Sequence, residues 1–395
     1  MENQKKINNI DLSIVLPCLN EEKAVKFCLD SITETIQKNN LSAEIIIVDN
    51  NSTDDSAKII KEYQKNNPTI NLILVEEKVR GYGSAYQKGF SIAQGSYIFM
   101  ADLDGTYDFN DIPRFIEKLK EDYDFVIGNR FANNNKNQKK LGSMPWLHRY
   151  IGNPILSGIV HLFFGIKIKD IHSGARLIKK ESLEKISPNT CGMEFASEMI
   201  IKAKRINLLM AEIPIKYNNR IGVSKLESLK DGWRHLRFIF LFSPLFLFLL
   251  PGLFLFTIGF ISMFILYFTT PSLFNITFYI HPMFISSGFI IAGYQLIFFA
   301  FFAKTYAIIH LKEKNIFFEK LYKYITLEKA SLFGIFLFII SIIIYSNIFF
   351  TWINSSFGPL NEIKNSVLAL TLLVLSIQTI SSGFMLSIIS IREKI

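Results

Sequence analysis

The stretch GSYIFMADLDGTY, residues 95–107, decides the fold of this chain. Its first half is an apolar run of β-forming residues, which predicts a buried strand ending at two acids, Asp102 and Asp104. Carboxylates one residue apart diverge on a strand, but where the chain turns they converge on one hard cation. Mg²⁺ or Mn²⁺ is the expected cation, because each is held by carboxylates together with phosphate oxygens. For so short a pattern, the alternative is a solvated acidic turn.

Strand-like and helix-like segments alternate on both sides of this stretch. Apolar runs at residues 12–17, 44–48 and 71–75 are each followed by a helical pattern, and a helix at 111–120 leads to a run at 125–128. This alternation predicts an α/β domain with a mostly parallel, doubly wound sheet. Ligands bind such sheets at the carboxyl ends of the strands. No G-x-G-x-x-G follows the first strand, so a dinucleotide-binding Rossmann site is not predicted.

Polar segments follow the predicted strands, and each has a simple structural alternative. Asn20 and Glu21 open a helix, where an N-cap and a first-turn acid are common. Gly81 and Gly83 lead into another helix, whose free N–H groups could face a phosphate; a simple turn is the alternative.

Taken in order, these motifs resemble the family 2 glycosyltransferases of the GT-A fold (a Rossmann-like α/β fold) over about residues 10–240. The resemblance implies a nucleotide-sugar donor, GDP- or UDP-hexose, and a metal on Asp102 and Asp104 that bridges the diphosphate. The donor-binding residues implied are Pro17, Leu19, Asn20, Glu21, Val48, Asp49, Asn50, Asp54, Gly81, Gly83 and Lys225. The chain departs from the family where the usual Asp-Asp-Gly-Ser reads Asp49-Asn50-Asn51-Ser52.

Later segments narrow the resemblance to polyprenyl-phosphate sugar transferases of the dolichol-phosphate mannosyltransferase-like branch. These segments are residues 128–131, 144–153, 170–176, 192–198 and 220–226. The resemblance implies that the phosphate of a polyprenyl (dolichyl or undecaprenyl) lipid is held by Arg130, Arg149, Asn153 and Arg220, and the donor diphosphate by Lys225. It names Asp102, Asp104, Arg130 and Arg149 as catalytic. Arginine offers phosphate a bidentate fork, although any single arginine is more simply a solvated surface charge.

The last part of the chain is much more apolar than the first. Four uncharged runs, residues 245–268, 283–303, 331–353 and 367–390, are each long enough to cross a bilayer. We therefore predict a cytosolic catalytic domain at residues 1–225, an amphipathic interface helix at 226–244, and an all-α transmembrane domain of four helices at 245–395. The four runs hold no acid, lysine or arginine, which favours an anchor and oligomer interface over an ion path.

Basic residues in the loops predict the orientation in the membrane. Six lysines lie between 304 and 329, whereas residues 269–282 carry no lysine or arginine and residues 354–366 carry Lys364 alone. The positive-inside rule then places both termini and the catalytic domain in the cytosol, in an integral protein of the cytoplasmic (inner) membrane. The N-terminal residues contain no apolar run, so no cleaved signal peptide is expected.

Charge and cysteine content limit the partners. The net charge of +9 favours anionic ligands and acidic membranes, and no nucleic-acid-binding motif is present. The three cysteines, Cys18, Cys28 and Cys191, lack metal-binding spacing and are expected to be reduced thiols.

The predicted reaction is inverting, metal-dependent transfer of a hexose from a nucleotide diphosphate sugar to a polyprenyl monophosphate. A phosphate monoester has a second pKa of about 6, so it needs no catalytic base. Two alternatives remain: a processive polysaccharide synthase, or a non-enzymatic lipid–sugar carrier with a transferase-like domain. The Gln-x-x-Arg-Trp segment usual in such synthases is missing here, and the intact Asp102 and Asp104 oppose a degenerate site.

Overall fold

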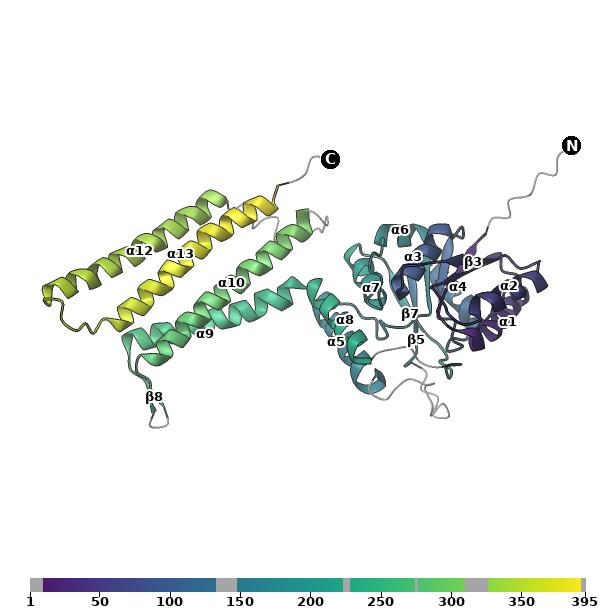
Figure 1. The fold of residues 1–395 in the computed structure, drawn as a ribbon, viewed down its shortest axis with the longest axis horizontal. Coiled ribbons are helices and arrows are strands. Elements are labelled where there is room, and N and C mark those ends of the chain that lie inside the picture. The colour runs from purple at the N-terminus through teal and green to yellow at the C-terminus, as the bar shows by residue number, and fades with distance from the viewer. Residues whose placement is uncertain (1–9, 133–147, 223–227, 274–275, 310–325, 392–395) are drawn as a thin grey trace. The chain divides into compact units, whose positions relative to one another are not determined.

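The computed structural model describes residues 10–132, 148–222, 228–273, 276–309 and 326–391. It divides into two compact units that meet at residues 239 and 240. The first unit contains a seven-stranded sheet and its helices, and the second contains long apolar helices (Figure 1). The boundary lies within helix α8 (Ser228–Leu241), in the segment that the sequence analysis assigned to an interface helix.

The sheet has the strand order β3-β2-β1-β4-β6-β5-β7, and β6 alone among these strands runs antiparallel to its neighbours. Its strands are β1 (Leu12–Cys18), β2 (Ala43–Asp49), β3 (Leu72–Glu76), β4 (Tyr97–Met100), β5 (Phe125–Asn129), β6 (Arg176–Lys179) and β7 (Met210–Pro214). The predicted α/β fold with a mostly parallel sheet is confirmed. A short hairpin, β8 (Ser272–Leu273) with β9 (Ile276–Thr277), lies in the second unit.

Helices cover both faces of the sheet, which explains why β1 reads as a continuous apolar run. Ile14 and Leu16 belong to the core that includes residues of helices α1 and α4, whereas Val15 lies against Gly89 of α3 on the other face. The helices and helical turns of this unit are α1 (Glu22–Lys38), α2 (Ser56–Asn66), α3 (Tyr82–Ile92), η1 (Phe109–Asp111), α4 (Ile112–Lys120), η2 (His148–Gly152), α5 (Asn153–Phe164), α6 (Lys180–Ile186), α7 (Phe195–Arg205) and α8.

The order of the strands places the functional segments together. The chain leaves β1 toward β2 on one side, while β4 pairs with β1 on the other, so the connections diverge between β1 and β4. A crevice at the carboxyl ends of the strands forms at such a switch point. The segments after Cys18 and after Met100 therefore meet at this edge.

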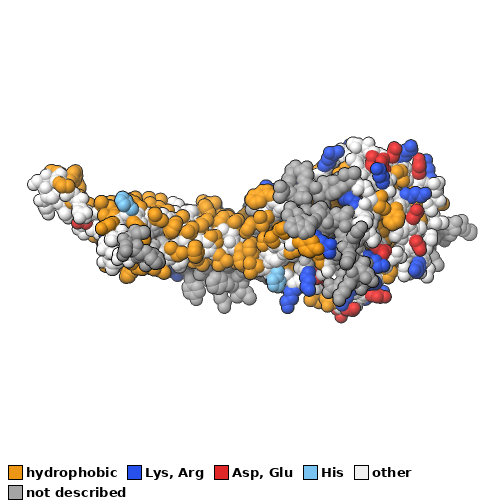
Figure 2. Space-filling view, turned by 90° about the horizontal axis from the view of Figure 1, so that it is seen from below, with side chains coloured by type: hydrophobic (Ala, Val, Ile, Leu, Met, Phe, Trp, Pro, Cys, Tyr) orange, Lys and Arg blue, Asp and Glu red, His pale blue; other side chains and the backbone are white. Residues whose placement is uncertain are grey.

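Among its described residues, the second unit contains four helices long and apolar enough to span a membrane: Leu245–Phe268, His281–Ile309, Leu327–Asn354 and Ile363–Ile389. They comprise η3 (Leu245–Leu249) with α9 (Leu250–Phe268), α10 (His281–Ile309), α12 (Leu327–Asn354) and α13 (Ile363–Ile389). Apolar side chains cover their surface, whereas charged side chains gather on the first unit (Figure 2). Three of these helices extend beyond the predicted apolar runs, so Lys304, Lys329 and Lys364 are helical.

Small and polar residues hold these helices together, as in other membrane bundles. A Cβ on Gly293 of α10 would lie 2.4 Å from the backbone nitrogen of Phe256 in α9, so the two backbones touch there. Hydroxyl pairs join α10 to α13, with Ser287 Oγ 2.7 Å from Thr371 Oγ1 and Tyr294 Oη 2.7 Å from Thr379 Oγ1.

Candidate functional site

The two acids after β4 lie where the chain turns at Gly105, which has a φ of 78°. Asp102 Oδ1 accepts a hydrogen bond of 2.9 Å from the Tyr82 hydroxyl. Asp104 Oδ1 accepts one of 3.0 Å from the Thr106 N–H and another from the Thr106 hydroxyl. Burial, followed by the charge of Asp104, raises the pKa of Asp102 to about 7, although Tyr82, Arg220 and Arg130 oppose the shift. Two carboxylates are therefore held close together in a poorly solvated place.

Arg220 joins this acidic pair to the loop that follows β1. Its Nη1 lies 3.1 Å from Asp104 Oδ2, and its Nη2 donates to Glu21 Oε1. Backbone bonds hold the same segment over the acids: Ile221 N–H donates to Asp104 O at 2.9 Å, and Asn218 N–H donates to Thr106 O at 2.8 Å. The structure thus brings together Glu21, Asp104 and Arg220, three residues that the sequence analysis placed in the site.

Arg130 follows β5 and is only 7% exposed, so it is not a solvated surface charge. Its Nε and Nη2 donate to Asp170 Oδ2 and Oδ1, both at 2.8 Å, and its backbone N–H donates to Oδ2 at 3.0 Å. The guanidinium lies 5.3 Å from the ring centroid of Tyr217. Burial by itself lowers the pKa of Arg130, but the Asp170 carboxylate outweighs it and the pKa is raised. Part of this guanidinium is therefore already used within the protein.

Arg149 and Asn153 lie on a separate stretch, in η2 and at the first position of α5. The Arg149 guanidinium lies 5.1 Å from the ring centroid of Tyr150. Lys225 lies outside the described residues.

The loops after β1 and β2 bind each other through the residues predicted to hold the donor. The Thr53 N–H donates to Asn20 Oδ1 at 2.7 Å, and Asp54 accepts from the Glu22 and Ser56 N–H groups at 3.1 and 3.0 Å. The N-cap of α1 is Glu21, without a side-chain cap bond, so the alternative of Asn20 as N-cap is wrong. A cavity of about 300 Å³ opens beside these loops. It is lined by Asn20, Glu21, Glu22, Lys23, Thr53, Asp54, Ile221 and Gly222.

Pro17 pairs with Val48 and Cys18 pairs with Asp49 in the register of β1 and β2, and Leu19 directly follows β1. Asp49 Oδ1 accepts from the Ser52 N–H at 3.2 Å, which turns the chain toward Asp54.

Asn50 has a structural role that the sequence did not reveal. Its Nδ2 donates to Glu77 O at 3.0 Å and to Val79 O at 2.8 Å, and its Oδ1 accepts from the Gly81 N–H at 2.7 Å. The amide thereby fixes the loop before α3. An aspartate could not make the first two bonds, because a carboxylate has no proton to donate at neutral pH.

Gly81 and Gly83 allow another loop to approach α3 closely. A Cβ on Gly81 would lie 2.2 Å from Cys191 O, and one on Gly83 would lie 2.0 Å from Thr190 O. Cys191 O accepts from the Gly83 and Ser84 N–H groups at 2.9 and 3.3 Å. These N–H groups are not free to face a phosphate, so the structure supports the turn that the sequence offered as the alternative.

Two residues missed by the sequence analysis complete the surroundings of Asp102. Tyr82 is the residue between the two glycines, and its hydroxyl binds Asp102. Gly174 lies so close that a Cβ there would be 2.8 Å from Asp102 Oδ2, and its N–H donates to the Tyr107 hydroxyl at 2.6 Å. A tyrosine between two glycines has no distinguishing pattern in the sequence, so only the folded chain reveals its role.

The chain is similar in sequence to several known proteins. Residues 13–187 match the domain described as Glycosyl transferase family 2, and residues 302–390 match the Glycosyltransferase family 2 C-terminal transmembrane region. The chain is 32% identical to the low-salt glycan biosynthesis hexosyltransferase Agl6 of Haloferax volcanii, over 95% of this chain and 88% of that protein. It is 30% identical to the dolichyl-phosphate beta-glucosyltransferase of Dictyostelium discoideum, over 58% of this chain and 72% of that protein.

Among solved structures, the mannosyltransferase PcManGT of Pyrobaculum calidifontis is similar with a TM-score of 0.39 and 13% identity, covering 93% of this chain and 86% of that one. The likeness to Agl6 extends over nearly the whole chain, including the membrane helices. The family predicted from the motifs is thereby confirmed: the chain belongs to the family 2 glycosyltransferases and is a membrane-integral glycosyltransferase.

Proposed function

We propose that this enzyme transfers a hexose from a nucleotide diphosphate sugar to a polyprenyl monophosphate, with inversion. The observation that carries the proposal is the ion-paired cluster of Glu21, Asp104 and Arg220 at the switch point of the sheet. It links the loop predicted to hold the nucleotide to the acidic pair through a guanidinium suited to phosphate. The likeness to a hexosyltransferase and to a dolichyl-phosphate glucosyltransferase supports the sugar and the lipid.

The donor would occupy the cavity beside the loops after β1 and β2. Asn20, Glu21 and Asp54 line it, and the side chains of Asp49 and Asn50 fix neighbouring loops by accepting from the Ser52 and Gly81 N–H groups. These residues would hold a UDP or GDP sugar across the carboxyl ends of the strands. Pro17, Leu19, Val48, Gly81 and Gly83 would support the donor site, and Lys225 would bind the diphosphate.

Asp102 and Asp104 fit a divalent cation. Burial and mutual repulsion raise the pKa of Asp102, so a cation between the two carboxylates would relieve both effects. Within the described residues no group of three His, Cys, Asp or Glu side chains could hold a metal, so water and diphosphate oxygens would supply the remaining ligands. Bound Mg²⁺ or Mn²⁺ would neutralise the charge of the leaving diphosphate. Thr106 uses its hydroxyl to orient Asp104.

The chain's own residues then position two anions. Arg130, Arg149, Asn153 and Arg220 would hold the lipid phosphate and offset its repulsion from the donor. One phosphate oxygen forms the new bond to the anomeric carbon as the bond to the diphosphate oxygen breaks, and the nucleoside diphosphate leaves. The acceptor is already ionised, so no residue needs to remove a proton.

The proposed location is the cytosolic face of the cytoplasmic membrane. The four apolar helices among the described residues would return the chain to its starting side, and by the positive-inside rule the lysines between 304 and 329 support a cytosolic position for that side.

The test is to incubate the full chain in nanodiscs with a panel of radiolabelled UDP and GDP hexoses and undecaprenyl phosphate. We expect one donor to yield a chloroform-soluble monoglycosylated lipid. In that assay, Arg149→Ala should raise the KM for the lipid phosphate at least tenfold and leave the KM for the nucleotide sugar within twofold. A polymeric product would favour a polysaccharide synthase, and no product with any donor would favour a carrier.

A further inference from the structure

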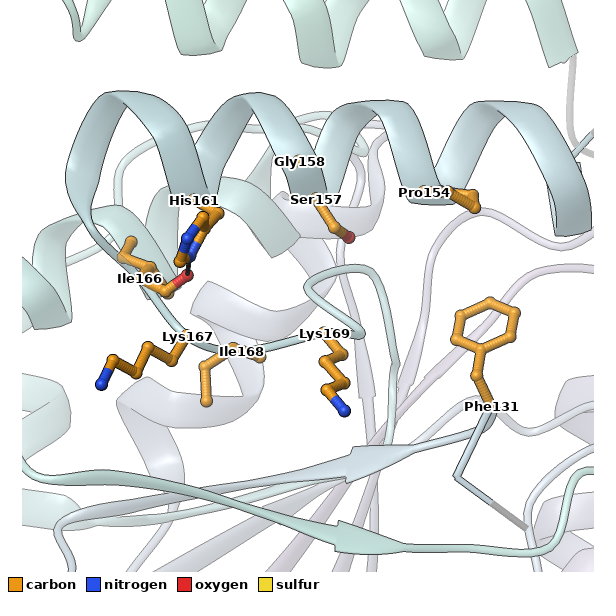
Figure 3. A pocket seen from close by; sticks show the side chains of 9 residues that line it. All are labelled: Phe131, Pro154, Ser157, Gly158, His161, Ile166, Lys167, Ile168 and Lys169. Carbon is orange, nitrogen blue, oxygen red and sulfur yellow. Dashed lines mark hydrogen bonds between the residues drawn. The ribbon is translucent and has the colours of Figure 1, made fainter. Parts of the chain in front are cut away.

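A groove beside the proposed acceptor site lies between α5 and the segment at residues 166–169 (Figure 3). Its volume is about 460 Å³, within the range of small-ligand sites. Phe131, Pro154, Ile166 and Ile168 give it mostly apolar walls. None of these four side chains has a role in the mechanism proposed above.

One polar group inside the groove lacks a protein partner. Ser157 is 8% exposed, and its Oγ has no hydrogen-bond partner among the described residues. Its side chain points from α5 toward the segment at 166–169 (Figure 3). A buried hydroxyl without a partner costs free energy, so a ligand acceptor at this position would stabilise it.

The opposite side of the groove is basic. The segment Ile166-Lys167-Ile168-Lys169 alternates, with both isoleucines buried and both lysines exposed. Neither lysine forms an ion pair with the described residues. The nearby acids are already engaged: Asp170 binds Arg130, and Glu212 accepts from the Lys169 and Asp170 N–H groups at 2.8 and 2.9 Å. His161, on the α5 side, has its Nδ1 3.0 Å from Ile166 O. The positive charge of the lysines is therefore available to an anion.

Helix α5 also exposes large apolar side chains to the outside. Ile155 and Leu162 are 54% and 66% exposed, an arrangement typical of helices that lie on a bilayer surface. In its described residues the same chain has four helices long and apolar enough to span a membrane, which would tether the first unit to a bilayer. Lysines beside a lipophilic helix are attracted to anionic lipids.

We propose that this groove binds the headgroup of an anionic phospholipid. Lys167 and Lys169 pair with its phosphate, Ser157 Oγ–H donates to a phosphate or ester oxygen, and the apolar walls hold the first carbons of an acyl chain. The groove adjoins the proposed acceptor site, since the Phe131 ring centroid lies 5.7 Å from the Arg130 guanidinium and Pro154 follows Asn153, but it uses none of the residues assigned to the acceptor phosphate. It would hold the catalytic unit against the acidic leaflet.

The test uses the full chain in nanodiscs that contain photoactivatable phosphatidylglycerol or phosphatidylcholine, with crosslinks mapped by mass spectrometry to residues 154–169. A lysine near an anionic surface contributes about a fivefold preference, so Lys167→Gln with Lys169→Gln should lower phosphatidylglycerol crosslinking about 25-fold. Salt at about 1 M should lower it in the wild type. The control pair, Lys58→Gln with Lys61→Gln on α2, is equally exposed and should leave crosslinking unchanged.

Gly158 offers a second, uncharged test. A Cβ there meets nothing within 4 Å, so Gly158→Phe fills the groove without a clash at the backbone and should abolish crosslinking, whereas Gly158→Ala should not. Equal labelling by phosphatidylcholine, or unchanged labelling in the lysine and Gly158→Phe variants, would overturn the proposal. It would also be overturned if a photoreactive polyprenyl phosphate, and not phosphatidylglycerol, labelled the groove.

Discussion

At the scale of single residues, the site depends on a few side chains whose partners lie far away in the sequence. Arg220 contacts Glu21 and Asp104. The hydroxyl of Tyr82, at the start of α3, binds Asp102, which follows β4. Each contact joins two segments that are distant in the sequence through a charged group or a hydroxyl.

Asp104→Asn should lower the transfer rate at least about 100-fold, because it removes one of two charges that would hold the cation. The fold should persist, since an amide oxygen can still accept the two Thr106 bonds. Single-turnover transfer with saturating Mn²⁺ measures the first effect, and the thermal midpoint measures the second. The exposed acid Asp30, changed to asparagine, is the matched control; normal turnover by Asp104→Asn would remove this residue from the mechanism.

Asn50→Asp should destabilise the first unit by about 2 kcal/mol, because two partly buried hydrogen bonds are lost and a carboxylate faces two carbonyl oxygens. Since the loop before α3 would shift, the KM for the nucleotide sugar should also rise. Thermal unfolding and donor titration check the two effects. The control is its exposed neighbour: Asn51→Asp should change neither the stability nor the KM for the nucleotide sugar. An Asn50→Asp protein with wild-type stability and wild-type KM would refute the role of the amide.

At the scale of elements, helix α8 is anchored to the sheet unit by a buried histidine. His235 is 7% exposed, its Nδ1 lies 3.0 Å from Ser197 Oγ of α7, and its ring lies 4.4 Å from that of His172. Burial, together with the charge of Arg176, lowers the pKa of His235 to about 4. The imidazole is therefore neutral in the folded protein at pH 7.

This depressed pKa predicts a loss of stability in acid. An unfolded histidine has a pKa of about 6.5 and so binds a proton first as the pH falls, which favours the unfolded state. The contribution of neutral His235 to the free energy of unfolding should be complete above about pH 6.5. It should fall by about 3 kcal/mol as the pH approaches 4. Comparing the free energies of unfolding of wild type and His235→Phe between pH 7 and 4.5 isolates the pH dependence that is due to His235. Parallel pH profiles for the two proteins would contradict it.

The contact between α9 and α10 depends on a glycine. Gly293→Ile should lower the thermal midpoint of the membrane unit and its yield in detergent, because the new Cβ meets the backbone of Phe256 at 2.4 Å. Gly288→Ala on the same helix is the control, since a Cβ there has open space. Equal midpoints for the two variants would show that the helices separate without cost.

At the scale of the whole molecule, one question is the side of the membrane on which the first unit lies. Burial raises the pKa of both Cys18 and Cys28 to about 12, so these thiols should resist alkylation. Cys191 is exposed. A membrane-impermeant maleimide should therefore label wild type at this position in inside-out vesicles and not in right-side-out ones, and Cys191→Ser should lose the label. Labelling in right-side-out vesicles would place the first unit on the opposite face.

Local pattern in the sequence was sufficient for the strand–helix alternation, the acidic turn after β4 and the four apolar helices, because burial and periodicity act over a few residues. It could not supply the contacts between distant loops. Only the tertiary structure shows that Asn50 fixes the loop at residues 77–81, that Gly81 and Gly83 receive Cys191 rather than offering free N–H groups, and that Arg130 is paired with Asp170. Such partners are chosen by the order of strands in the sheet, which brings together residues 30 to 200 positions apart and leaves no local signature in either segment.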